Sequence, residues 1–321
     1  MLPVLLGVLP GSVLADWYKQ EQAIMGTSVS VELWHDNRLQ AQKCIALVMD
    51  NMRRIDTNMS PFKPDSELSR LNRDAGSKDI KVSKELFQLI KRANEVSVMS
   101  EGRFDITFAS VGYLYDYRNA IRPSDATLKP LLGSINFRYL KLNPQNRTIH
   151  YLHPHVRIDL GGIAKGHAVD QGIRILQQCG ITHALVSAGG DSRIIGDRLG
   201  LPWMTGIRHP REKNNFAVIL PLTDTAISTS GDYERYFIEN GVRYHHIISP
   251  ATGKPAKTAE SVTILGPETT TTDALSTAVF VMGPEKGLKL IERLPGIEAI
   301  VIDTEGKIHY TSGLLKPASG K

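Results

Sequence analysis

Cysteine is scarce in this chain: only Cys44 and Cys179 occur among its 321 residues. Two cysteines cannot complete a zinc site by themselves, so the sequence contains no cysteine-rich metal centre. Each lies in or near the end of a helical pattern, where cysteine commonly serves as a small buried apolar side chain. We therefore expect both to be buried apolar residues, with a single disulfide in an oxidising compartment as the alternative.

Dense runs of basic residues are also absent, although the chain has 38 Lys and Arg against 33 Asp and Glu. The basic side chains are scattered and do not interleave with aromatic residues, so we expect no nucleic-acid partner. No Walker A loop, complete dinucleotide fingerprint or nucleophile elbow occurs. Hydrophobic residues make up 41% of the chain and charged residues 22%, which is typical of a globular domain with an ordinary core.

An uncharged stretch rich in Leu, Val, Gly and Pro occupies residues 1–15. It is too short to span a bilayer as a stable helix, and the small residues Val13 and Ala15 precede Asp16 as in a signal cleavage site. We expect residues 1–15 to be a secretion signal and residues 16–321 to form a single unit of one or two lobes. The expected location is the periplasm, with this segment either cleaved or kept as an N-terminal membrane tether.

The order of predicted strands and helices indicates the fold class. Strands are predicted at residues 27–35, 140–142, 148–151, 184–187, 203–207, 217–220, 225–229, 244–248, 261–265, 299–302 and 307–311. Helices are predicted at residues 37–56, 83–96, 165–178, 273–282 and 284–294. Because consecutive strands with short turns favour antiparallel pairing, we predict an α+β fold with mixed, largely antiparallel sheets and packed helices.

The segment RIDLGGIAKGHAVDQ, residues 157–171, gives the strongest functional indication. It predicts the end of a buried strand at residues 156–158, a tight turn at Gly161 and Gly162, and a helix that begins near Ala164. A glycine turn before a helix points unpaired N–H groups at one place, where the helix dipole adds partial positive charge. Lys165 adds a full positive charge, so this turn suits a phosphate group.

Asp159 precedes this turn and must serve another purpose, because a carboxylate repels phosphate. Its partner would be a sugar or base hydroxyl, a ring nitrogen or a metal ion. A phosphate-binding turn next to such an acid indicates an enzyme with a nucleotide-like ligand.

A second candidate site lies in TTTTDALSTAVF, residues 269–280. If a helix begins near Asp273, the side chains of Asp273 and Thr277 are four residues apart and share one face. Both carry hard oxygen donors, which suit Mg²⁺ or Ca²⁺ together with carbonyls, water and ligand phosphates. In the alternative interpretation, Thr272 or Asp273 caps the helix and Thr277 is a small packed residue.

Two adjacent histidines, His245 and His246, lie on a predicted strand, so only one of them can face a ligand. That side chain could contact a phosphate or act as an acid or a base, and the alternative is a hydrogen-bonded structural histidine. His153 and His155 have no carboxylate partner close by, and we interpret them as loop residues.

Eight segments occur together and in the order found in one family. Through them the chain resembles the FAD:protein FMN transferases, the ApbE-like flavin transferases, from Met25 to beyond Gly283. The segments are MGT at 25–27, MSPFKPDSELSRLN at 59–72, GRFDIT at 102–107, DLGGIAKGHAVD at 159–170, SAGGD at 187–191, TSGDYERYF at 229–237, HIISPATGKP at 246–255 and DALSTAVFVMG at 273–283.

The resemblance implies a T-fold-like α+β architecture for the catalytic unit and Mg²⁺-dependent chemistry with FAD as the substrate. The FAD pyrophosphate is cut, FMN is attached to a Thr or Ser hydroxyl of an acceptor protein, and AMP leaves. A subunit of an inner-membrane redox complex is one acceptor of this kind. The alternatives are an FAD pyrophosphatase that gives FMN and AMP, and a non-enzymatic FAD-binding protein.

Site residues follow from the resemblance by position. The implied FAD contacts are Met25, Phe62, Arg103, Phe104, Asp105, Asp159, Lys165, His246 and Ile248. The implied metal ligands are the side chains of Asp273 and Thr277 and a backbone carbonyl between Gly162 and Ala164, and the implied catalytic base is Asp273 or His246. Phe62 stands where many relatives have Tyr, which removes a hydroxyl and keeps an aromatic ring. Ser249 stands where Asp is common, so no acid role is expected there.

Overall fold

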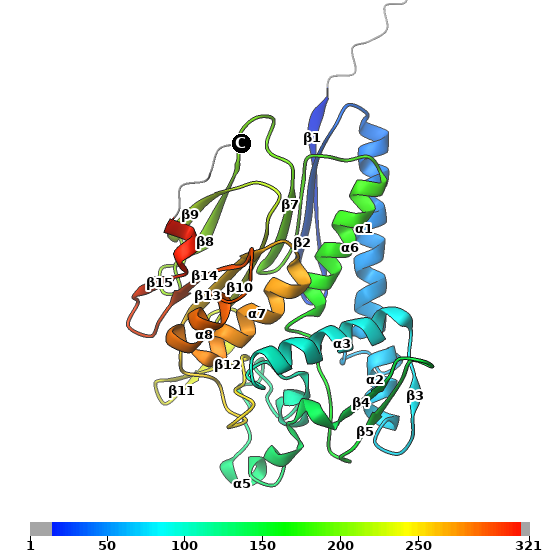
Figure 1. The fold of residues 1–321 in the computed structure, drawn as a ribbon, viewed down its shortest axis with the longest axis vertical. Helices are drawn as coiled ribbons and strands as arrows, with labels where there is room; N and C mark the ends of the chain where they lie inside the picture. The colour runs from blue at the N-terminus through cyan, green and yellow to red at the C-terminus, as the bar shows by residue number, and fades with distance from the viewer. Residues whose placement is uncertain (1–14, 316–321) are drawn as a thin grey trace, which may run out of the picture.

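An eight-stranded sheet forms the centre of the molecule in the computed structural model, which describes residues 15–315 (Figure 1). Every neighbouring pair in it is antiparallel, which agrees with the predicted α+β class. In spatial order the strands are β1 (Asp16–Ile24), β2 (Thr27–His35), β6 (Ala184–Ala188), β7 (Asp191–Ile195), β10 (Ala226–Gly231), β13 (Ser261–Gly266), β14 (Glu298–Ile302) and β15 (Ile308–Tyr310). The predicted signal segment lies outside the described residues except for Ala15.

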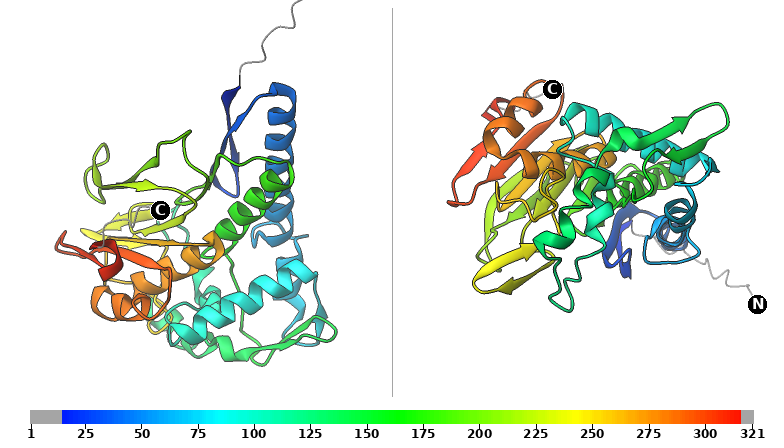
Figure 2. Two further views of the ribbon diagram at one scale, coloured as in Figure 1. Left: turned by 45° about the horizontal axis from the view of Figure 1, so that its top comes forward. Right: turned by 90° about the horizontal axis from the view of Figure 1, so that it is seen from below.

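Long helices cover one face of this sheet (Figures 1 and 2). They are α1 (Arg38–Met59), α6 (Ala164–Gln178) and α7 (Thr269–Met282), followed by the shorter α8 (Pro284–Ile291). Helix α6 packs against α1 on one side and α7 on the other. Side chains alternate between the two faces of each strand, so Ile195 joins the main core under the helices while Ile194 points the other way. No helix within residues 15–315 has the length and apolar character needed to cross a membrane.

The opposite face of the sheet is covered by a hairpin of β8 (Trp203–Arg208) and β9 (Phe216–Leu222). Trp203 and Leu222 from this hairpin pack with Ile194, Ile227 and Leu265 of the sheet in a second, smaller apolar cluster. The sheet is therefore buried on both faces in its middle.

A smaller region lies at the N-terminal end of α6, in the lower part of Figure 1. It contains α2 (Glu67–Asp74), α3 (Lys84–Met99), α4 (Ala109–Gly112), α5 (Asp125–Leu128) and the three-stranded sheet β3–β5–β4, with β3 (Ile80–Lys81), β4 (Leu140–Asn143) and β5 (Thr148–Tyr151). A separate hairpin joins β11 (Tyr236–Glu239) to β12 (Val242–His245). The main apolar cluster continues from the large sheet into this region, through Leu86 and Ile149.

Three of the predicted elements differ from the structure. Residues 156–158 do not form a strand, because the backbone N–H and C=O of Ile158 bond to the side chain of Asn72, at 2.8 Å each, and not to a neighbouring strand. Helix α7 begins at Thr269 and not at Asp273, so Asp273 lies in the second turn. The predicted strand at 244–248 ends at His245.

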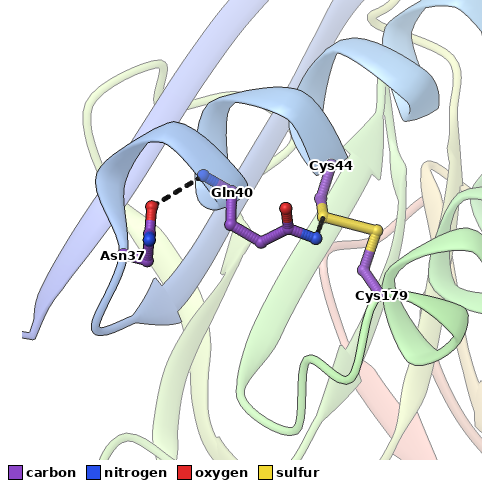
Figure 3. Close-up of a disulfide and its surroundings, with 4 residues drawn as sticks. All are labelled: Asn37, Gln40, Cys44 and Cys179. Atoms are coloured by element: carbon purple, nitrogen blue, oxygen red, sulfur yellow. Dashed lines mark hydrogen bonds between the residues drawn. A yellow bond between two sulfur atoms is a disulfide. The ribbon is translucent and has the colours of Figure 1, made fainter.

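Cys44 and Cys179 form a disulfide, which was the alternative to two unpaired buried cysteines (Figure 3). It joins α1 to the residue that follows α6, with the two Cα atoms 6.3 Å apart, which is normal disulfide geometry. Gln40 lies one turn before Cys44 in α1, and its amide donates a hydrogen bond to the Cys44 sulfur (Figure 3). The bridge spans 135 positions of sequence and fixes the C-terminal end of α6.

The carboxylate of Glu85 in α3 ties three helices together. It accepts hydrogen bonds from Arg54 of α1 at 2.6 and 2.9 Å and lies 2.9 Å from Nε2 of His167 in α6. The hydrogen bond to His167 and the bonds from Arg54 outweigh burial and lower the pKa of Glu85 to about 2. The ionised carboxylate therefore stabilises the position of α6.

The disulfide predicts a stability effect. Replacing both Cys44 and Cys179 by Ala should lower the free energy of unfolding by about 2–5 kcal/mol, because the unfolded chain loses a long cross-linked loop. Chemical denaturation with and without a reductant measures this. Wild type should lose a similar amount when reduced, and the variant should not respond to the reductant. Two freely reactive thiols in the folded, unreduced wild type would contradict the bridge.

Glu85 predicts a pH effect on stability. Because its folded pKa, about 2, lies below its ordinary 4.5, the stabilisation is complete above pH 4.5 and is lost as the pH falls towards 2. Glu85→Gln should lower the free energy of unfolding by about 1–2 kcal/mol at neutral pH, and the difference should vanish in acid. The exposed Glu285→Gln on α8, whose partner is Lys289, is the control with little effect. Equal effects of the two changes at neutral pH would contradict the role of Glu85.

Candidate active site

The turn before α6 is built around Asp159 and two glycines. Asp159 accepts the N–H of Gly161 at 2.6 Å, and the chain then enters α6 at Ala164. The N–H groups of Ile163 and Ala164 both donate to the carbonyl of Leu160. The prediction that the N–H groups of this turn are unpaired is therefore largely wrong, because most of them donate to acceptors within the turn itself.

Lys165 supplies the positive charge of this site. Its Nζ atom lies 2.7 Å from Asp191 of β7, 3.4 Å from each carboxylate oxygen of Asp273 on α7, and 3.2 Å from the carbonyl of Gly161. Three segments far apart in sequence thus meet at one ammonium group. Asp191 was not among the predicted site residues, although it belongs to the SAGGD segment.

The first turns of α6 and α7 touch. Asp273 accepts the N–H of Gly166 at 3.0 Å. Gly166 lies in the first turn of α6, where an N–H group has no partner within the helix, and the Asp273 carboxylate supplies that partner. A Cβ atom on Gly166 would overlap the carbonyl oxygen of Thr269 and lie 2.8 Å from Cβ of Asp273. Only glycine at position 166 allows this approach.

Thr277 lies on the same face of α7, one turn after Asp273. Its Oγ1 is 3.2 Å from Oγ of Ser230 on β10. A Cβ atom on Gly162 would lie 3.3 Å from this oxygen and 3.2 Å from the ring of Phe104. Gly162 therefore lies close to both Phe104 and Thr277.

The charges in this cluster shift the acidity of its members. Burial and the nearby Asp191 raise the pKa of Asp273, Lys165 and the Gly166 N–H oppose the rise, and the net result is a pKa of about 7. Burial by itself would lower the pKa of Lys165, but Asp191 and Asp273 raise it overall above its usual value. Lys165 is therefore charged, and two buried carboxylates share one ammonium. Burial also raises the pKa of Asp159.

His246 and Arg235 lie beside the cluster. Arg235 donates to the carbonyl of Gly26 at 3.4 Å, so the Met25–Gly26 turn between β1 and β2 is close by, and the N–H of His246 donates to the Arg235 carbonyl at 3.1 Å. Burial lowers the pKa of His246 to about 3, with the charges of Arg235, His245 and Lys165 contributing. Nδ1 of His246 is buried and has no hydrogen-bond partner among the described residues.

His245 is the structural member of the histidine pair. It is buried, its Nε2 lies 2.8 Å from the carbonyl of Ala256, and its ring packs edge-on against Phe280 at 5.5 Å between centroids. Of the two alternatives for the pair, the hydrogen-bonded structural histidine is therefore His245, and His246 is the one near Lys165.

Other predicted contacts have different surroundings. Asp105 is buried, and its two oxygens accept from Thr107 and from the N–H of Phe137, so it holds the loop that carries Phe104. Arg103 is half-buried at the start of this loop. Ile248 is buried in a small apolar cluster with Val111 and Leu128. Phe62 lies in the loop between α1 and α2 with 85% of its surface exposed.

The residue types limit what metal could bind here. No group of three or more His, Cys, Asp and Glu side chains suited to a metal occurs within residues 15–315. Any metal at this place would rely on Asp273, Thr277 and backbone oxygens. Such a donor set, made only of oxygen, suits Mg²⁺ and not zinc or copper.

The sequence pattern of the ApbE family matches residues 25–301. The chain belongs to the ApbE family. Its relatives include two proteins named FAD:protein FMN transferase. The protein from Treponema pallidum is 32% identical over 318 residues, which cover 93% of this chain and 88% of the relative. The protein from Vibrio cholerae is 32% identical over 307 residues, which cover 92% and 91%.

Solved structures of the ApbE family share the fold. The ApbE protein of Thermotoga maritima superposes with a TM-score of 0.86 at 32% identity, over 94% of this chain and 98% of that one. The flavin transferase ApbE from Vibrio cholerae gives a TM-score of 0.84 at 29% identity, over 94% and 99%. These likenesses confirm the predicted family and fold class. Membership of the ApbE family makes the chain an enzyme of the flavin-transferase class.

The close approach of α6 and α7 predicts a specific sensitivity. Gly166→Ala should lower the free energy of unfolding by about 1–3 kcal/mol, because the added methyl group meets backbone atoms of α7 that cannot rotate away. Gly133→Ala is the matched control, since a Cβ there meets nothing within 4 Å. Denaturant unfolding of both variants provides the measurement. Equal stability of the two would show that the helices can separate without loss.

Proposed function

We propose that this enzyme transfers FMN from FAD to a Thr or Ser hydroxyl of an acceptor protein, in a Mg²⁺-dependent reaction that releases AMP. One observation carries the proposal: the ammonium of Lys165 lies between Asp191 and Asp273 at the meeting point of α6 and α7. Splitting a pyrophosphate needs positive charge and fixed donors around the phosphate oxygens, and little covalent chemistry from the protein.

The residues present suit FAD. Lys165 and Arg235 are two cations beside the glycine turn, and a pyrophosphate carries two negative charges. The free Nδ1 of His246 offers a buried hydrogen-bond partner to the ligand. Asp159 retains one carboxylate oxygen beyond the Gly161 bond for a hydroxyl or ring N–H. The exposed ring of Phe62 and the buried ring of Phe104 are aromatic surfaces of the kind that stack on a flavin or adenine ring.

The residues present also suit Mg²⁺. Asp191 and Asp273 together carry one negative charge more than Lys165 neutralises, and Thr277 lies against Gly162. Asp273, Thr277 and the Gly162 carbonyl would hold the ion. When bound, it would supply positive charge next to the pyrophosphate oxygens.

The chain's own residues bind the substrate and direct the transfer. Lys165 and Arg235 hold the two phosphates so that the acceptor hydroxyl meets the FMN phosphorus on the side opposite the bridging oxygen. The acceptor hydroxyl oxygen bonds to the FMN phosphorus, the bond from this phosphorus to the bridging oxygen breaks, and AMP leaves with that oxygen. The hydroxyl proton passes to Asp273 or to the neutral ring of His246, the two bases within the cluster.

The location and the acceptor belong to the same proposal. A disulfide between Cys44 and Cys179 supports an oxidising compartment such as the periplasm. An acceptor there would be a protein with an exposed Thr or Ser, for example a subunit of an inner-membrane redox complex. If water takes the place of the hydroxyl, the same site gives FMN and AMP without transfer.

Asp273→Asn should reduce FMN transfer about 100-fold or more, because the site loses a charged ligand at the pyrophosphate. The assay mixes enzyme, FAD, Mg²⁺ and a Thr-bearing acceptor. It follows AMP by chromatography and covalent flavin by fluorescence of the denatured acceptor, with the added FMN confirmed by mass spectrometry. Asp303→Asn, at a turn between β14 and β15, is the control that should retain activity.

The products decide between the alternatives. Equal amounts of AMP and labelled acceptor support transfer. AMP without any labelled acceptor would replace transfer by FAD hydrolysis. FAD that stays intact with wild type and Mg²⁺ would leave only a flavin-binding protein.

A further inference from the structure

We propose that Asp170 is a positioning residue for this reaction: it caps α7 from the neighbouring helix α6 and thereby sets the place of Asp273 and Thr277. Asp170 contacts neither of these residues directly in its hydrogen bonds, and no predicted site included it. The inference rests on the proposed function, because it concerns the metal ligands on α7.

All of the hydrogen-bonding partners of Asp170 belong to the start of α7 or to β7. Its Oδ1 accepts the N–H of Thr269 at 3.0 Å and the guanidinium of Arg193 at 2.6 Å. Its Oδ2 accepts the N–H of Thr270 at 2.8 Å and the hydroxyl of Thr270 at 2.5 Å. Asp170 is 1% exposed, so water cannot replace these bonds.

Helix α7 depends on this contact because it lacks a cap of its own. The N-cap residue Glu268 makes no side-chain cap hydrogen bond. The first N–H groups of a helix have no partner within the helix, and a carboxylate there also interacts favourably with the helix dipole. Asp170, which lies on α6, supplies both the hydrogen-bond acceptors and the negative charge.

Helix α6 holds the start of α7 at two places, one at Gly166 and one at Asp170. Gly166 and Asp170 are four residues apart on the α6 face that meets α7. Gly166 holds Asp273 through its N–H, and Asp170 holds Thr269 and Thr270 one turn earlier. On β7, Asp191 pairs with Lys165 while Arg193, two residues further and on the same face, pairs with Asp170. Loss of the Asp170 hydrogen bonds would let the start of α7 move relative to Lys165.

The experiment compares Asp170→Asn with wild type for binding of Mn²⁺ alone, followed by electron paramagnetic resonance. Asn keeps the shape, but its amide N–H₂ would face donors in place of an acceptor oxygen. We expect Mn²⁺ binding to weaken about 10- to 100-fold, the range typical of lost support behind a metal ligand. The kcat for FMN transfer should fall more than the KM for FAD rises. Hydrogen exchange at residues 269–273 should become faster.

Two further variants separate positioning from general destabilisation. Thr270→Val removes only the hydroxyl bond and keeps the fold, and should weaken Mn²⁺ about 2- to 10-fold. Asp303→Asn changes a partly buried carboxylate in a distant turn that accepts two backbone N–H groups and lies 2.6 Å from His309, and should leave Mn²⁺ affinity unchanged even if the melting temperature falls.

The pattern of results tells the two hypotheses apart. Suppose that Asp273→Asn abolishes Mn²⁺ binding, while Asp170→Asn and Thr270→Val bind Mn²⁺ as tightly as wild type. This result would overturn the positioning role of Asp170 and keep the proposed metal site. Mn²⁺ binding that Asp273→Asn leaves unchanged would overturn the metal site and the positioning role together. We expect weaker Mn²⁺ binding in Asp170→Asn and in Thr270→Val, and unchanged Mn²⁺ binding in Asp303→Asn.

Discussion

The rest of the site depends on one buried ammonium group, Lys165, held by Asp191 and Asp273. A buried ion pair contributes little net stability compared with apolar packing, because desolvation of the charges offsets most of their attraction. Here two acids surround one cation, which is less favourable still. An arrangement that raises the pKa of Asp273 to about 7 is explained by chemistry at the site better than by stability of the fold.

The geometry around Lys165 follows from the contact between α6 and α7. The missing side chain of Gly166 brings the two helices close enough for its N–H to reach Asp273. Gly162, just before α6, lies next to Thr277 of α7, because a Cβ atom on Gly162 would be 3.3 Å from the Thr277 hydroxyl oxygen. The disulfide at Cys179 and the carboxylate of Glu85 fix α6 at its two ends. The site lies between the N-terminal turns of α6 and α7, and these contacts hold α6 rigidly in place.

The sequence predicted the elements with strong periodicity and missed those without it. The core helices and most central strands were found because their apolar residues repeat every 3.6 or 2 positions, whereas the central strand β7 was not predicted. Strand β1 was missed because its outward residues are mostly polar. Residues 156–158 were predicted as a strand because the apolar Val156 and Ile158 alternate with Arg157. Both side chains are buried in the structure, but without a strand partner. Asp273, Thr277, Lys165 and His246 could be found from motif chemistry. Asp191, Arg235 and Asp170 could not, since their roles arise only when β7, the residue before β11 and the start of α7 come together beside α6.

A count of charges explains why the proposed reaction needs a divalent ion. Lys165 and Arg235 contribute two positive charges, and Asp159, Asp191 and Asp273 contribute three negative charges when ionised, so the protein alone offers a net charge of −1. A pyrophosphate would add two more negative charges to a largely buried place, where unscreened repulsion is strong. One Mg²⁺ reduces the total to −1, whereas a monovalent ion leaves it at −2. In the proposed reaction, the acids that oppose phosphate binding are therefore the groups that would attract the divalent ion.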